Sequence, residues 1–185
     1  MLTKSDRLKE MIESGMDYRT RTIYLHGEID REGFSHFSAN LKLLNENKGP
    51  ICVEIFSEGG EYAAGFAVFD AISLSSNPID TVGTGEVSSI AAVVFQAGKK
   101  RILTPEARLM IHNVYVVMPD EKFTSHDLKR YSNEISILSS RYHQVLADRS
   151  GLSINKIRSW CEKEKYMSAK EAVKFGLADE IKARK

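Results

Sequence analysis

The 185-residue chain has the length of one ordinary domain, and 42% of its residues are hydrophobic, which is enough to bury a core. Its 26 basic and 25 acidic side chains leave a net charge of +1 and are mixed along the sequence, so neither nucleic acid nor a membrane is expected as a partner. The two cysteines, Cys52 and Cys161, belong to no CxxC or Cys/His cluster, which argues against zinc and for a reducing compartment. We find no signal-peptide core or membrane-length apolar run, and therefore expect a cytoplasmic protein.

Apolar periodicity predicts alternating strands and helices through the first two thirds of the chain. Helices are expected over Lys4–Glu13, Glu32–Asn47, Ala64–Ile72 and Ile90–Ala97. Strands are expected over Thr22–Gly27, Ile51–Phe56, Ile79–Val82, Arg101–Leu103 and Leu109–His112, with a turn framed by Gly83 and Gly85. This alternation predicts an α/β fold with crossover connections.

The last third of the chain is dominated by one long amphipathic helix. Apolar residues recur at steps of three and four from Leu128 to Val145, with Thr124 and Asp127 as cap residues and Gly151 as the terminator. A capping box, Ser168-x-x-Glu171, opens a shorter helix that is predicted to end at Gly176. We predict a single domain over residues 1–185, with an N-terminal segment over 1–20 and a protruding region over about 113–150.

Two glycine-bearing segments follow predicted strands and could hold reactive groups. The first is Ser57-Glu58-Gly59-Gly60, and the second runs from Gly83 to Ser89 and leads directly into a helix. A serine at such a junction lies near free backbone N–H groups and the positive end of a helix dipole, a place that suits a developing oxyanion. The alternative for Ser89 is an ordinary helix N-cap, and for the glycines an ordinary turn.

His112 is the best placed of the five histidines to act as a base, because it ends an apolar strand. By pattern alone, a structural histidine is the commoner interpretation. The GxSxG elbow of α/β-hydrolases is absent around Ser88 and Ser89, so a serine hydrolase of another design is required.

Four segments taken together resemble the proteolytic subunit of Clp protease, in order and spacing from about Arg21 to Ile181. They are Ser57–Gly60, Gly85–Ser89, Arg108–His112 and Tyr166–Ala172. The resemblance implies a ClpP/crotonase-like fold of repeated β-β-α units with a protruding handle helix. It also implies a serine endopeptidase without metal or other cofactor.

The resemblance assigns catalytic roles to three residues of this sequence. Ser89 is the expected nucleophile, His112 the base, and Glu164 the acid that orients the histidine. Glu164 stands where the family has aspartate; Asp120, Asp127 and Asp148 are less favoured substitutes.

The backbone N–H groups of Gly59 and Ile90 are the expected oxyanion donors, and Gly59 with Gly60 the expected substrate-binding segment. Glu58 replaces the proline of the family's Ser-Pro-Gly-Gly turn. The expected substrates are peptides or unfolded proteins. The expected assembly is a homo-oligomer of two stacked heptameric rings, with an AAA+ unfoldase ATPase as a partner.

Two other functions stay open at this point. Substitutions at Glu58 and Glu164 are compatible with a catalytically silent Clp-like subunit that has a structural or regulatory role. The related crotonase-like enzymes, which act on acyl-CoA, use a similar oxyanion hole, but this chain offers no recognisable CoA-binding extension and they would leave Ser89 and His112 without a role.

Overall fold

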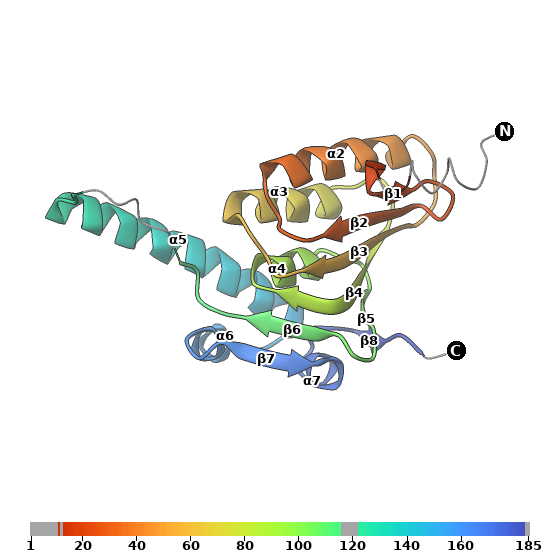
Figure 1. Cartoon of the computed structure of the whole chain (residues 1–185). Helices are drawn as coiled ribbons and strands as arrows, with labels where there is room; N and C mark the ends of the chain where they lie inside the picture. Colours follow the sequence, from red (N-terminus) through yellow and green to blue (C-terminus); the bar gives the residue numbers. More distant parts are fainter. Residues whose placement is uncertain (1–10, 12, 116–121, 184–185) are drawn as a thin grey trace.

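The computed structural model describes residues 11, 13–115 and 122–183, and within these ranges it is a mixed α/β structure built on one sheet (Figure 1). The sheet order is β1-β2-β3-β4-β5-β8, while β6 pairs with β4 and β7 pairs with β6. Neighbouring strands from β2 to β5 are parallel, as crossover connections require. The strands are β1 Met16–Asp17, β2 Thr22–His26, β3 Ile51–Ser57, β4 Ile79–Ser88, β5 Arg101–Leu103, β6 Arg108–Ile111, β7 Lys165–Ser168 and β8 Glu180–Ile181.

The predicted α/β class is confirmed, and most predicted elements are present within a residue or two of their expected bounds. The helices are α2 Arg31–Asn45, α3 Tyr62–Ser73, α4 Ile90–Gln96, α5 Ser125–Ser150, α6 Ile154–Cys161 and α7 Ala169–Lys174. The short elements β1, α6, β7 and β8 were not predicted. Most of the predicted helix over residues 4–13, and residues 116–121 of the protruding region, lie outside the described residues.

The predicted turn at Gly83 and Gly85 is wrong, because β4 continues through both glycines to Ser88. The first half of β4 pairs with β5 and its second half pairs with β6. Gly85 has φ +55°, and a Cβ on Gly83 would approach Leu103 to 2.6 Å, so these glycines let the strand bend and pack closely without ending it. The bend carries Ser89 to the end of β6.

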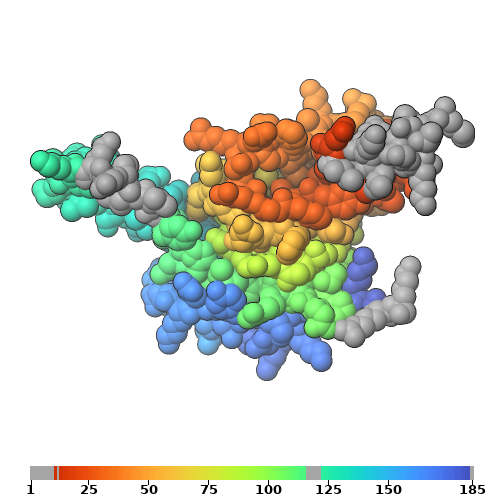
Figure 2. Space-filling view, viewed as in Figure 1, coloured from red at the N-terminus to blue at the C-terminus, as the bar shows by residue number. Residues whose placement is uncertain are grey.

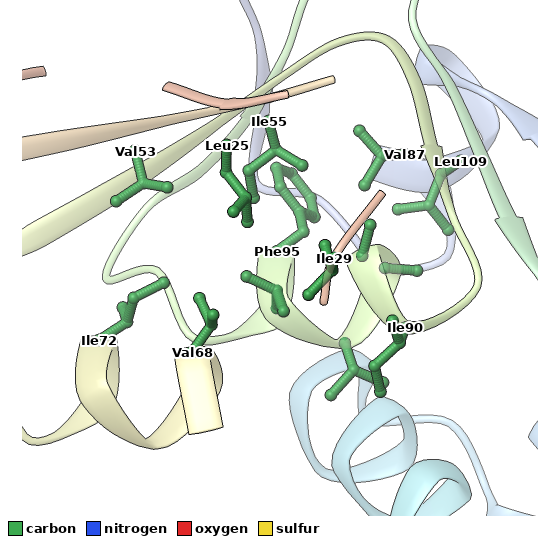
Figure 3. Packing of buried hydrophobic residues seen from close by; sticks show 14 of the residues in the cluster. Leu25, Ile29, Val53, Ile55, Val68, Ile72, Val87, Ile90, Phe95 and Leu109 are labelled. Carbon is green, nitrogen blue, oxygen red and sulfur yellow. The ribbon is translucent and has the colours of Figure 1, made fainter. Parts of the chain in front are cut away.

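The core lies between the sheet and helices α2 to α4. Every residue of α4 is buried, and Figure 3 shows Phe95 reaching from this helix toward Ile55 on β3. Val87 of β4 and Leu109 of β6 lie close together in the same view. A buried side chain of this size contributes about 1.5–3 kcal/mol relative to an exposed one, so α4 is firmly held. That matters because α4 begins at the residue after Ser89.

Helix α5 projects beyond the rest of the described structure, as Figures 1 and 2 show. The predicted caps are confirmed: Thr124 and Asp127 form a capping box, and Gly151 ends the helix in the left-handed region at φ +74°. At its inner part, Tyr62 donates a hydrogen bond to the Leu138 carbonyl at 2.8 Å. None of the helices in the described ranges is long and apolar enough to cross a membrane.

A buried arginine ties the C-terminal strand to the sheet. The Arg101 guanidinium donates to Asp179 Oδ1 at 2.5 Å, to Gln96 Oε1 at 2.6 Å and to the Arg149 carbonyl at 3.1 Å. Its side chain is only 6% exposed. No local sequence pattern indicates this network, because its members lie up to 78 residues apart.

The burial of His143 should make the free energy of unfolding depend on pH. It is 4% exposed where α5 meets α6, and its Nε2 has no hydrogen-bond partner in the described structure. Burial, followed by the charge of Arg158, lowers the pKa of His143 from its ordinary value of 6.5. The unfolded chain therefore binds this proton more readily, and the free energy of unfolding should fall as the pH falls below about 6.5 and level off below the folded pKa.

The measurement is urea unfolding at pH 7.5 and 5.5 for the wild type and for His143→Leu. The variant should show a smaller loss of stability between the two pH values than the wild type. An equal pH dependence in both proteins would show that His143 does not cause it.

Candidate active site

The pairing of β4 with β6 brings Ser89 and His112 together. Glu86 to Ser88 run parallel to Arg108 to Met110, and Ser89 N–H continues the ladder with a 3.0 Å hydrogen bond to the Met110 carbonyl. His112 follows the last residue of β6. Its Nε2 lies 2.7 Å from Ser89 Oγ, a distance at which a histidine can accept the serine proton.

The backbone of Ser89 has a positive φ, unlike the extended backbone of the other helix N-caps that the structure describes. Its φ is +56° and its ψ is −127°, and its side chain makes no capping hydrogen bond to α4. For a residue with a Cβ, this conformation costs of order 1–3 kcal/mol and is concentrated at functional sites. The interpretation of Ser89 as a simple N-cap is therefore wrong, because its hydroxyl points to His112.

A buried tyrosine supports this strained junction. Tyr142 of α5 donates a hydrogen bond to the Ser89 carbonyl at 3.1 Å and is 2% exposed. Burial raises the pKa of Tyr142 well above its ordinary value, so the phenol stays protonated and able to donate. Sequence reasoning missed Tyr142, since nothing in a helix 53 residues away marks it as a neighbour of Ser89.

The structure separates the two adjacent serines. Ser88 is buried, and its Oγ donates to Glu86 Oε1 at 2.8 Å. Only Ser89, of the two, contacts a histidine.

The glycine segment after β3 lies directly against the serine. A Cβ built on Gly59, whose φ is +114°, would lie 2.6 Å from Ser89 Cβ. The Gly59 N–H donates to Ser57 Oγ at 3.0 Å, so this expected oxyanion donor already has a partner. The N–H groups of Gly60 and Ile90 have no hydrogen-bond acceptor within the described part of the chain.

Glu164 lines the same cleft as Ser89 and His112 but forms no hydrogen bond or ion pair with the histidine. It is exposed and has φ +50°, in a turn where its N–H donates to the Cys161 carbonyl at 3.3 Å. Both residues are described, and no hydrogen bond or ion pair joins them. The ring of His112 instead packs beside that of Tyr115, with centroids 5.6 Å apart.

The less favoured acids have other partners or cannot be placed. Asp127 belongs to the capping box of α5, and Asp148 accepts a hydrogen bond from Gln144 at 2.6 Å. Asp120 lies outside the described residues.

The cleft that contains these groups has a volume of about 840 Å³, enough for several residues of an extended peptide. Its lining includes every site residue predicted from the sequence: Gly59, Gly60, Ser89, Ile90, His112 and Glu164.

Adding one methyl group at Gly59 should disable the site. A Gly59→Ala side chain would collide with Ser89 Cβ and lie 3.1 Å from its Oγ, so the serine must shift. We expect kcat/KM for a cleavable peptide to fall by on the order of 10²-fold or more, the cost of a displacement of about 1 Å. Gly27→Ala is the matched control, because Gly27 also has positive φ, at +77°, but nothing lies within 4 Å of an added Cβ. Equal losses in the two variants would contradict the steric explanation.

Comparison with known proteins places the chain in a family. The Clp protease family model matches residues 6–185, so the chain belongs to the Clp protease family.

Its relatives include proteolytic subunits of that protease. ATP-dependent Clp protease proteolytic subunit 2 of Borreliella burgdorferi is 32% identical over 167 residues, covering 88% of this chain and 83% of the relative. The subunit 2 of Streptomyces coelicolor is 33% identical and covers 89% and 76%. Among solved structures, a mutant of ClpP1 from Listeria monocytogenes superposes with a TM-score of 0.81 at 28% identity, covering 96% of this chain and 97% of that one. The predicted ClpP-type fold is confirmed.

Proposed function

We propose that the chain is a serine endopeptidase subunit that hydrolyses peptide bonds within a ring-shaped oligomer. The observation that carries the proposal is the 2.7 Å contact between Ser89 Oγ and His112 Nε2, made by a serine in a strained strand-to-helix junction. Membership of the Clp protease family supports the same reaction and disfavours acyl-CoA chemistry.

In the proposed mechanism, His112 takes the proton from Ser89 as its Oγ attacks the peptide carbonyl, and then delivers that proton to the leaving amine. Water attacks the acyl-enzyme in the second half of the reaction with the same help. The Ile90 N–H stabilises the oxyanion together with a donor from the Gly59-Gly60 segment. Gly60 N–H has no acceptor in the described part of the chain, whereas Gly59 N–H would first have to break its hydrogen bond to Ser57.

Glu164 is the proposed orienting acid. Its place in the cleft supports this role, and reaching His112 would require a movement of the turn that carries it. A protonated histidine without an acid partner is stabilised less, so the position of this turn would control activity.

The family also supports the proposed assembly. We infer two stacked heptameric rings of identical subunits in the cytoplasm, with the projecting α5 between the rings and an AAA+ unfoldase ATPase feeding unfolded protein to the chamber. If this assembly is correct, we expect short peptides to enter the chamber without nucleotide. Folded proteins should enter it only after unfolding by the ATPase.

The experiment is hydrolysis of a fluorogenic peptide library and of casein by the purified protein, with electron microscopy of the same sample. Cleavage of short peptides by ring-shaped particles supports the proposal. Particles that cleave neither peptides nor casein, alone or with ATPases of the host, would overturn it.

A catalytically silent subunit is the second candidate. The observations that favour it are that no hydrogen bond or ion pair joins His112 and Glu164, both described, and that the N–H of Gly59 is already bonded to Ser57. This candidate predicts that the protein forms rings and changes the activity of an active partner subunit without hydrolysing peptides itself.

A further inference from the structure

The rim of the cleft is acidic, and we propose that the enzyme prefers peptides with lysine or arginine beside the scissile bond. This inference rests on the proposed function, because it concerns the same cleft. The carboxylates that line the cleft are Glu28, Glu58, Glu61 and Glu164, and no lysine or arginine is among its described lining residues. The net charge of the chain is +1, so the acidity is local to the cleft.

Backbone pairing gathers three of these carboxylates at one place, which we call the acidic rim: Glu28, Glu58 and Glu61. The N–H of Ile29 donates to the Gly59 carbonyl at 2.7 Å, and the Ile29 carbonyl accepts from Glu61 N–H at 2.7 Å. Glu61 is therefore bonded directly to Ile29. Glu28 and Glu58 are the chain neighbours of Ile29 and Gly59, which are bonded to each other. Gly59 itself lies against Ser89, so the acidic rim borders the nucleophile.

The acidic rim is only partly neutralised by the protein. Arg31 pairs with Glu61 at 3.3 Å, and its side chain is 87% exposed. Glu28 and Glu58 are exposed and form no ion pair with any described residue. Like charges held close together repel one another, and a cationic side chain of a substrate would relieve that repulsion.

An aromatic ring in the cleft lining adds a second means of holding a cation. Tyr115 and Tyr166 line the cleft; the Arg108 guanidinium of the protein lies 5.1 Å from the Tyr166 ring centroid, which leaves Tyr115 for a substrate cation. Tyr115 is 72% exposed and offers a ring face near His112. A lysine or arginine of the substrate could lie between this ring and the acidic rim.

The test uses three fluorogenic peptides that share one cleavable core and carry lysine, glutamine or glutamate on both sides of it. For the wild type we expect kcat/KM to be roughly three- to tenfold higher for the lysine peptide than for the glutamine peptide, and lowest for the glutamate peptide. Raising the ionic strength should shrink these ratios, since the charges are exposed. Glu28→Gln combined with Glu58→Gln should bring the lysine-to-glutamine ratio close to one.

Glu46→Gln is the matched control, because Glu46 is exposed at the C-terminus of α2, is not among the cleft-lining residues and should keep the wild-type ratio. Equal kcat/KM values for the lysine and glutamate peptides, or an unchanged ratio in the double variant, would overturn the inference. Binding of the same peptides to Ser89→Ala, followed by fluorescence anisotropy, separates the two proposals. Lysine-selective binding without any cleavage by the wild type would contradict the proposed function alone, whereas cleavage without lysine selectivity would contradict the inference alone.

Discussion

Ser89→Ala should lower kcat/KM for a cleavable peptide by on the order of 10⁴- to 10⁶-fold, the largest effect expected of any single substitution in this chain. The reason is geometric: Ser89 Oγ is 2.7 Å from His112 Nε2, and the adjacent Ser88 Oγ is committed to Glu86 at 2.8 Å. No neighbouring hydroxyl of this segment can take its place. The measurement is steady-state hydrolysis of a fluorogenic peptide, with ring assembly checked in the same preparation.

Ser88→Ala is the natural control, since it removes a hydroxyl one residue away without touching the Ser89–His112 contact. Its effect should be a moderate loss, because the hydrogen bond from buried Ser88 to Glu86 is removed. Full activity of Ser89→Ala together with a large loss in Ser88→Ala would reverse the assignment of the two serines.

Arg101→Ala should produce the largest loss of stability, about 3–5 kcal/mol in the free energy of unfolding. The substitution leaves Gln96 Oε1 and the Arg149 carbonyl without their arginine donor, in a site where the arginine side chain is 6% exposed. Burial opposes ionisation of Asp179, but the hydrogen bonds and charge of Arg101 outweigh it and lower the pKa of that carboxyl. The part of the stability that comes from Asp179 should therefore be complete above about pH 4 and be lost as the pH falls through the folded pKa.

Urea unfolding at one fixed protein concentration measures the effect, because oligomerisation shifts apparent stability. Arg31→Ala is the matched control: it breaks the pair with Glu61, in which the arginine is 87% exposed, and should cost at most about 1 kcal/mol. Similar losses in the two variants would show that burial of Arg101 is not what makes its ion pair important.

The helices and long strands could be predicted from sequence because their signals are local. The step of three and four along α5, its capping box at Thr124 and the capping box at Ser168 each lie within one element. Local sequence predicts a strand that ends at Val82, because glycine often marks a turn. Pairing with β5 and then β6 instead holds β4 extended through Gly83 and Gly85. Tertiary pairing therefore overrode a local preference.

The candidate site likewise contains residues that local sequence predicts and residues that it does not. Ser89 and His112 could be chosen from four short segments in register, and the structure brings their side chains together. The support from Tyr142, the bond between Ser57 and Gly59, and the position of Glu164 depend on contacts between distant parts of the chain, which no local pattern carries. The expected oxyanion donors, Gly59 and Ile90, were assigned through the resemblance, because backbone N–H groups leave no mark in residue type.

Covalent labelling with a fluorophosphonate tests whether Ser89 is a nucleophile activated by His112. The probe forms a phosphorus–oxygen bond to an activated serine as fluoride leaves, and peptide mapping by mass spectrometry locates the adduct. We predict a single adduct on Ser89 that is lost in Ser89→Ala and strongly slowed in His112→Ala. An unlabelled wild type, or an adduct on another residue that persists in Ser89→Ala, would show that Ser89 is not the activated nucleophile.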